Sequence, residues 1–458
     1  MHPAAGGGQI ERRHRRRDDG IDDDEDDQHD RADELSGSDR HDPPLLFAPL
    51  RRRQGVVPHR RRRARPLGRP GRQCQPRPCD FPALDRLPLS VHMARDMTTI
   101  SHSAAGPVAR SPRLRDRAAI RWWLYVTALL IFALVLVGGA TRLTESGLSI
   151  TEWKPIHGIV PPLSAAEWDE EFELYKHIPQ YQQLNLGMSL DEFKTIFWWE
   201  WAHRFLARAI GFVFAIPLAF FWLTGRIEPF LKPRLVGILA LGGLQGAVGW
   251  WMVASGLTER TDVSQYRLAT HLTIACVIFA AIIWVARGLA PKRFDMPPSR
   301  GSASVAALIA LLALAQIYMG GLVAGLNAGL TFNTWPLMDG ALIPGGLFVM
   351  DPAWRNFFEN VMTVQFMHRI GAYVLFAVVA IHAVASLLQA AGSVHTKRAI
   401  LLFAAVFVQA LIGITTLLLA VPIDWALAHQ AGGVIVLGLA VTHARALKGE
   451  YPEPAPVA

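Results

Sequence analysis

The stretch that decides the fold class is residues 119–140, AIRWWLYVTALLIFALVLVGGA. An α-helix rises about 1.5 Å per residue, so about 20 apolar residues cross the hydrocarbon core of a bilayer. This stretch meets that length and holds a single charged side chain, Arg121, close to its start. We therefore predict that it is a transmembrane helix.

Seven further stretches of similar length and apolar character follow it, separated by polar connections. The chain is therefore predicted to be an all-α integral membrane protein with eight transmembrane helices. The eight predicted spans run at about 119–140, 196–224, 234–255, 265–289, 303–325, 361–389, 398–421 and 424–446.

The orientation of the spans follows from the positions of Arg and Lys. These residues gather before the first predicted span, after the second, fourth and sixth, and after the eighth. Because cytoplasmic connections carry the excess of Lys and Arg, both termini are predicted to lie inside. The long connections at 141–195 and 326–360 then lie outside. We expect a multi-pass protein of the bacterial inner (plasma) membrane, surrounded by membrane lipid.

Residues 1–117 differ from the rest, because Arg, Asp, Pro and Gly dominate and the first Lys of the chain is Lys154. Such a segment cannot bury a core. One interpretation is a disordered basic arm. The other, which we favour, is a leader produced by a start of translation placed too early, with Met93 or Met97 as the true start.

The three cysteines do not form a framework. Cys74 and Cys79 precede the first span, whereas Cys276 lies inside the fourth. Neither a structural disulfide nor a zinc site is indicated.

The eight spans divide into two halves that resemble one another, residues 118–290 and 300–448, followed by a tail at 449–458. Four spans return the chain to the same side of the membrane, so the halves are predicted to be parallel four-helix bundles related by an axis along the membrane normal. The matching segments are Gly138-Gly139 with Gly320-Gly321, EWAHR at 200–204 with QFMHR at 365–369, Gln245/Gly249 with Gln409/Gly413, and His271 with His429.

Two pairs of glycines have the G-x-x-x-G spacing that lets helices pack closely. They are Gly242/Gly246 and Gly321/Gly325. We expect both pairs to lie at helix contacts, although the pattern is common in membrane proteins and says little about function.

Four histidines fall at one depth, roughly 10 Å below the outer surface at about 1.5 Å per residue. A lone histidine in a membrane span is more often a packing or hydrogen-bonding residue than a ligand. Two at one depth in each four-helix half instead favour paired axial ligands of heme iron. Zinc would need further Cys or carboxylate ligands, which neither half supplies. The four are His203, His271, His368 and His429, whereas His382 and His443 lie near the inner ends of their spans.

Arginines accompany two of these histidines. Arg204 and Arg369 each follow a histidine directly. They either neutralise heme propionates near the outer surface or extend toward it as interfacial side chains. Arg142, at the end of the first span, has no charged counterpart, because Ala324 occupies the matching position. The outer connections are rich in Pro and Trp and are expected to cover the two sites.

One residue breaks the match between the two halves. Glu200 aligns with Gln365, so only the N-terminal half has an ionisable group three residues before its histidine. The i, i+3 spacing places Glu200 and His203 on one helix face. A carboxylate there can take a proton or stabilise positive charge that develops on a bound molecule. The alternative is an interfacial residue that is hydrogen-bonded to the outer loop.

Several longer motifs resemble the heme A synthase family, in the form found in proteobacteria and mitochondria. They are GGATRLTESGLS at 138–149, EWAHR at 200–204, NTWPLMDG at 333–340 and FMHR at 366–369. The resemblance covers about residues 119–448. It implies a membrane oxidoreductase that oxidises the C8 methyl of heme O to a formyl group by successive hydroxylations, giving heme A for cytochrome c oxidase.

The resemblance also implies that the two halves hold different hemes. In the C-terminal half, His368 and His429 would ligate the iron of a heme b cofactor, and we assign Arg369 to the same site. The electron acceptor stays open, because the outer loops lack the cysteine pair that some Gram-positive members carry there.

In the N-terminal half, His203 and His271 would hold the substrate heme O through its iron. Glu200 would be the catalytic residue. We assign Arg204 and Arg142 to this substrate site.

The expected small-molecule partner is thus heme O. A heme O synthase that hands it over and a second copy of the chain are candidate protein partners, and no nucleic acid is expected. Two other classes stay open. A diheme b-type cytochrome that passes electrons to or from quinone explains the histidines but gives Glu200 no role, and a transporter with parallel repeats does not explain their shared depth.

Overall fold

The computed structural model describes residues 112–152, 157–291 and 301–452. Within these ranges the regular structure is helical, apart from one isolated bridge between Met338 and Ala341. The described residues all belong to one compact unit of the chain. The predicted leader lies outside them except for residues 112–117, and so does the end of the tail, 453–458.

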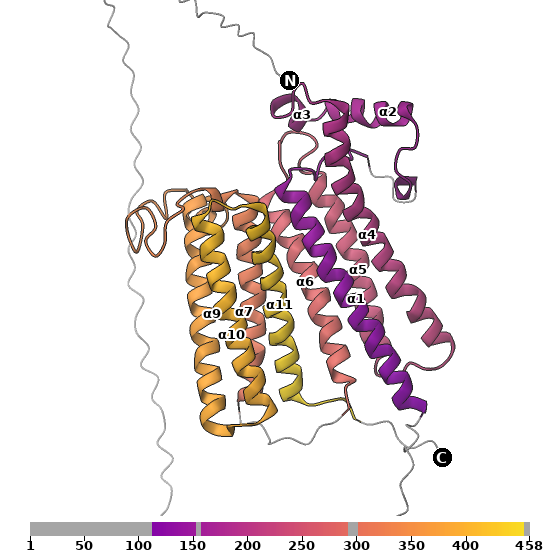
Figure 1. Ribbon diagram of the computed structural model, residues 1–458, viewed down its shortest axis with the longest axis vertical. Helices are drawn as coiled ribbons and strands as arrows, with labels where there is room; N and C mark the ends of the chain where they lie inside the picture. Colours follow the sequence, from indigo (N-terminus) through magenta and orange to yellow (C-terminus); the bar gives the residue numbers. More distant parts are fainter. Residues whose placement is uncertain (1–111, 153–156, 292–300, 453–458) are drawn as a thin grey trace, which may run out of the picture. The chain divides into compact units, whose positions relative to one another are not determined.

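Eight of the described helices are long and apolar enough to cross a membrane, which confirms the predicted number (Figure 1). The largest differences from the predicted bounds are the starts of the first two, at residues 112 and 190. The eight are α1 (Pro112–Leu143), α4 (Leu190–Leu223), α5 (Lys232–Val253), α6 (Gln265–Gly288), α7 (Ser302–Gly325), α9 (Val361–Ala390), α10 (Val394–Leu418) and α11 (Ile423–Lys448).

Local chemistry explains why α4 begins before its apolar stretch. The Ser189 side chain accepts a hydrogen bond from the Glu192 backbone N–H, and the Glu192 carboxylate accepts one from the Ser189 backbone N–H. This reciprocal pair satisfies backbone groups that a helix start leaves open. Helix α1 begins at Pro112, so the boundary predicted at 117 lies inside a helix and was placed too late.

The helices form two rings of four. In the first ring, α1 and α5 each contact α4 and α6. In the second ring, drawn in orange to yellow in Figure 1, α7 and α10 each contact α9 and α11. Each ring consists of the four spans of one predicted half. The rings are joined by contacts of α6 with α7 and of α11 with both α1 and α6.

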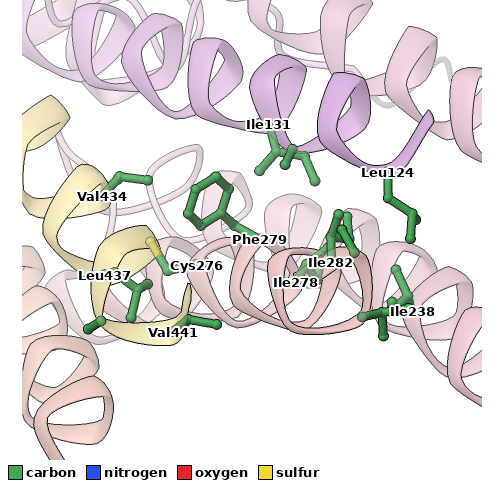
Figure 2. Packing of buried hydrophobic residues seen from close by; sticks show 14 of the residues in the cluster. Leu124, Ile131, Ile238, Cys276, Ile278, Phe279, Ile282, Val434, Leu437 and Val441 are labelled. Atoms are coloured by element: carbon green, nitrogen blue, oxygen red, sulfur yellow. The ribbon is translucent and has the colours of Figure 1, made fainter. Parts of the chain in front are cut away.

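A large apolar core occupies this junction. Figure 2 shows Phe279 of α6 between Ile131 of α1 and Val434 of α11. Gly438 of α11 leaves room for the aromatic ring, because an added Cβ would lie 3.2 Å from it. Cys276 is fully buried in the same core and is a free cysteine.

The two G-x-x-x-G pairs behave differently. An added Cβ at Gly321 would lie 2.8 Å from the Cα of Ala269, and one at Gly325 would lie 2.6 Å from the Cα of Gln265. These glycines therefore let α7 approach α6, as expected. An added Cβ at Gly242 or Gly246 would meet nothing within 4 Å, so the expectation for that pair was wrong.

Short helices build the two outer connections. In the first connection, Phe172 and Tyr175 of α2 pack against Phe193 at the start of α4, so the loop has its own small core. The short helices are η1 (His157–Ile159), α2 (Ala165–Lys176) and α3 (Pro179–Gln183) in the first connection, and η2 (Ala328–Leu330), η3 (Ala353–Arg355) and α8 (Asn356–Glu359) in the second.

The residues after α11 bind the end of the first ring where α1 begins and α6 ends. Arg117 of α1, which is 6% exposed, pairs with Glu228 through two contacts of 2.6 and 2.8 Å and donates to the Pro452 carbonyl at 2.6 Å. The Tyr451 backbone N–H donates to the carbonyl of Gly288 at 2.8 Å. Residues 449–452 therefore fasten the last helix to α1 and α6; we call them the C-terminal clasp.

Candidate functional site

Three of the four histidines lie in cradles made by a glutamine and a glycine on a neighbouring helix. The glutamine and glycine are four residues apart, so they share one helix face. The cradles are Gln245 and Gly249 of α5 around His271, Gln316 and Gly320 of α7 around His368, and Gln409 and Gly413 of α10 around His429.

The contacts in the three cradles are alike. The glutamine Nε2 donates to the backbone carbonyl of the histidine at 3.0, 2.8 and 2.7 Å in chain order. The same nitrogen lies 3.1, 3.1 and 3.0 Å from the imidazole Nδ1, and in the first two cradles it is also 3.4 Å from the imidazole Nε2. An added Cβ on the glycine would lie 2.9, 3.2 and 2.5 Å from the imidazole Cε1 in chain order, which is a collision at Gly249 and Gly413 and a tight contact at Gly320. Each cradle thus fixes both the backbone and the ring of its histidine.

His203 is the exception. It lies against Gly138 of α1, where an added Cβ would be 2.9 Å from the imidazole Nε2. The position four residues before Gly138, where a glutamine would complete the cradle, is Leu134. The His203 site therefore has the glycine of the other cradles but lacks the glutamine amide.

The Q-x-x-x-G spacing aligned the two halves at Gln245/Gly249 and Gln409/Gly413, but that match predicted no role for the glutamines. Gln316 and Gly320 form a third copy with the same spacing, which the match between the halves did not include. Seeing three copies beside three histidines would have identified the cradles.

His368 and His429 face each other across the second ring of helices. Their imidazole centroids are 6.3 Å apart, and the two imidazole planes meet at 79°. A metal–imidazole bond is about 2 Å long, so this separation leaves room for one ion between two ring nitrogens. In the described part of the chain, no group of three or more His, Cys, Asp or Glu side chains could hold a metal. The donor set therefore fits the two-histidine axial ligation of heme and does not fit zinc.

A second histidine pair lies 14 residues further along the same two helices, but its geometry is different. His382 and His443 are 5% and 1% exposed, and their Nε2 atoms are 2.8 Å apart. That distance is a direct hydrogen bond, which occupies a nitrogen of each ring. This inner pair joins α9 to α11 and leaves no room for an ion between the bonded nitrogens.

Glu200 is 2% exposed and makes three hydrogen bonds. One oxygen accepts from Ser149 Oγ and from the Ile150 backbone N–H, both at 2.8 Å. The other accepts from Arg204 Nη2 at 2.6 Å. The carboxylate therefore binds the first outer connection, as the alternative interpretation of this residue expected.

Gln365 does the equivalent task in the second ring without a charge. Its Nε2 donates to the carbonyls of Ala328 and Thr331 at 2.6 Å each, and its Oε1 accepts from Arg369 at 2.7 Å. The loop polarity is matched to each side chain, since donors face Glu200 and acceptors face Gln365. Fastening the outer loop is therefore a shared task, and the negative charge is peculiar to the first ring.

The arginines also bind protein groups. Arg204 donates to the carbonyl of Ile150 at 2.8 Å, and Arg369 donates to those of Phe332 and Thr334 at 2.8 and 2.9 Å. Arg142 reaches from α1 to the end of α7, where it donates to Ala324 O and to Asn327 Oδ1. Ala324 is the repeat counterpart of Arg142, so this contact joins the two rings at matching positions.

A helical protein with eight helices that are long and apolar enough to cross a membrane belongs to the class of multi-pass membrane proteins, and its facing histidines are a donor pair of the kind that axial ligation of heme requires. The chain belongs to the COX15-CtaA family of cytochrome oxidase assembly proteins, whose description matches residues 121–441.

Curated relatives are close in sequence. The heme A synthase of Sinorhizobium medicae is 65% identical over 339 residues, which cover 74% of this chain and 92% of the relative. That of Mesorhizobium japonicum is 63% identical over 353 residues, covering 77% and 97%. That of Agrobacterium fabrum is 64% identical over 343 residues, covering 75% and 94%.

Proposed function

We propose that this chain is a heme A synthase of the bacterial inner membrane, with both termini in the cytoplasm, and that it oxidises the C8 methyl of heme O to a formyl group. The observation that carries the proposal is the carboxylate of Glu200, which stands three residues before His203, whereas the uncharged Gln365 holds the matching position before His368. The names of the relatives support the same reaction. A pure electron carrier has no use for this difference.

The second ring is the proposed site of a heme b cofactor, held by His368 and His429. The 6.3 Å separation of their rings and the two complete cradles support permanent binding there. When bound, heme b supplies a one-electron carrier between the substrate and an acceptor. Arg369 is proposed to favour the cofactor's carboxylates by its positive charge, although its guanidinium also holds loop carbonyls.

The first ring is the proposed substrate site, where His203 and His271 hold heme O through its iron. Each hydroxylation of the methyl removes two electrons and two protons, and water supplies the oxygen. The second hydroxylation gives a gem-diol, which loses water to form the aldehyde. Arg204 and Arg142 are proposed to contribute positive charge at the outer end of this site, from positions where both are tied to backbone carbonyls.

Glu200 is proposed to act at the methyl. Its charge stabilises the positive charge that develops as electrons leave the carbon, and its oxygen can take a released proton. Each Glu200 oxygen has two lone pairs, and Arg204 occupies one on Oε1. The hydrogen bonds to the outer connection hold the carboxylate three residues from the iron-binding histidine on one helix face.

The activity is tested by expression in a host that makes heme O but not heme A, followed by pigment extraction and chromatography. We expect heme A to appear. Protein that carries heme b while heme O stays unchanged would support the diheme cytochrome instead.

The role of Glu200 is tested by Glu200→Gln, which copies the second ring. Because a positioned acid or base contributes about 10²–10⁴-fold, the rate of heme A formation should fall by that factor while heme stays bound. Full activity would remove Glu200 from the reaction.

Ser149→Ala is the matched control, since it removes one loop hydrogen bond and keeps the charge. A hydrogen bond contributes about 1 kcal/mol, so this variant should lose less than about tenfold in rate. Equal losses in both variants would show that loop fastening alone explains Glu200.

A further inference from the structure

The four histidines differ in how firmly the protein holds them. In the second ring the cradle amides are themselves enclosed: the Oε1 atoms of Gln316 and Gln409 lie against Gly371 and Gly432, each three residues after the histidine. A side chain at either glycine would collide with the amide oxygen. Each amide of the second ring therefore occupies space that a glycine on the histidine's own helix leaves open.

The first ring holds its histidines less firmly. Gln245 fixes His271, but Ile274 stands three residues after that histidine, where the second ring has a glycine. His203 has only the glycine wall of Gly138, and Leu134 offers no hydrogen bond. Within the described ranges, no hydrogen bond to the His203 ring is found. The atom of the His203 imidazole nearest to its glycine is Nε2, whereas in the other three histidines the nearest atom is Cε1.

The glutamine amide anchors the backbone carbonyl of its histidine and bounds one side of the imidazole, so it keeps a ligand histidine in one orientation; losing an outer contact that orients a ligand typically costs 10- to 100-fold in metal affinity. The absence of this anchor at one ligand of a pair therefore weakens that ligand alone. Two histidines that are both held in place retain a permanent cofactor. A heme that enters as substrate and leaves as product needs a pair in which one histidine is not held in place, so that its bond to the iron can break.

We propose that residue 134 sets how long the first ring keeps its heme, because Leu134 leaves His203 as the exchangeable axial ligand while His271 stays fixed. Leu134 is thus a positioning residue that acts through His203. The inference rests on the proposed function only in treating the first-ring heme as substrate. The difference in heme retention follows from the cradles whatever reaction is catalysed.

The test gives each ring the residue that the other ring has at this position, Leu134 in the first ring and Gln316 in the second. Purified full-length protein is loaded with hemin at both sites, and loss of heme to excess apomyoglobin is followed by absorbance. Wild type should lose heme in a fast and a slow phase of equal amplitude. Leu134→Gln should slow the fast phase by about 10- to 100-fold, and Gln316→Leu should accelerate the slow phase by a similar factor.

Leu134→Met is the matched control, because it changes the shape of the side chain without adding an amide, and it should leave both phases as in wild type. A fast phase unchanged in Leu134→Gln, together with a slow phase unchanged in Gln316→Leu, would overturn the proposal. If Leu134→Gln does not fold, Gln316→Leu and Gln409→Leu still decide it through the slow phase.

Turnover gives a second readout. If product release follows His203 dissociation, Leu134→Gln should lower steady-state heme A formation while a single turnover keeps its wild-type rate. An equal fall in both would place residue 134 in the chemical step and contradict the proposal. Wild-type protein that releases heme in two phases but leaves heme O unchanged would refute the proposed function and leave this inference standing.

Discussion

Arg204 and Arg369 form hydrogen bonds with backbone groups of the protein. Their positions in the sequence predicted contacts with heme propionates or with the membrane interface. In the structure, both guanidinium groups donate to carbonyls of the connections at 141–195 and 326–360. Hydrogen bonds to such carbonyls cannot be read from hydropathy. They depend on where a loop of more than thirty residues returns over its own helix.

Residue Glu359 of α8 gives a prediction at this scale. Hydrogen bonds from Arg355 and then from Tyr266 lower the pKa of its carboxyl below the ordinary value of 4.5. A lowered pKa in the folded state means that the ionised group adds stability above its unfolded pKa and loses it as pH falls through the folded pKa. We therefore expect the second outer connection to loosen as pH falls below about 4.5. Hydrogen exchange at α8, measured between pH 6 and 3, checks this.

Glu359→Gln is the control for that experiment. It should remove the acid-dependent component and leave the exchange rate at α8 nearly independent of pH after correction for intrinsic exchange. The same acid profile in this variant would assign the loosening to another group.

At the scale of helices, the contacts of glycine decide which pairs approach closely. Gly321 is packed against the α6 backbone, so Gly321→Ala should force the two helices apart and destabilise the protein by about 1–3 kcal/mol. Gly246 has open space around it, so Gly246→Ala should be neutral or slightly stabilising, because Ala favours a helix by about 1 kcal/mol over Gly. Thermal unfolding in detergent measures both, and a similar loss at the two positions would contradict this assignment.

The same two glycine pairs mark how far the sequence alone could reach. Length and hydropathy predicted eight spans, because the thickness of the bilayer sets a similar minimum length for every spanning helix. The match between the two halves pointed to the four histidines and to the one carboxylate without a counterpart. Which face of a helix meets a neighbour is set by packing, and G-x-x-x-G occurs on both kinds of face. The hydrogen bond between His382 and His443 could not be predicted for the same reason, because the sequence does not say that these two faces of α9 and α11 meet.

Across the whole molecule, the two rings are joined by contacts far apart in the chain. Arg142 links the end of α1 to the end of α7, and the C-terminal clasp links α11 to the start of α1 and the end of α6. A third link lies between them, because Gln430, next to His429, donates to the carbonyl of Val135 at 2.7 Å. The two sites are thus held in one fixed relation from end to end.

Shortening the chain tests the clasp. A chain that ends at Lys448 loses the Pro452 acceptor of Arg117 and the Glu450 partner of Arg287, which pair at 2.9 Å. Arg287 and Glu450 are partly buried, with side chains 11% and 14% exposed, so losing this pair should cost less than the about 3–5 kcal/mol of a fully buried pair but should still lower the unfolding midpoint. A chain that ends at Pro452 keeps both contacts and should melt like the full chain. Equal midpoints for the two shortened chains would show that the clasp adds no stability.

The clasp also has a consequence for the order in which the protein matures. Residues 449–452 follow all eight membrane-crossing helices of the described part of the chain, so they are synthesised after them, yet they complete the contacts of α1 and α6. The first ring can enter the membrane during synthesis, but Arg117 and Arg287 must wait for these partners until the second ring has been made. The ring proposed to bind substrate is therefore completed only after the second ring has been synthesised.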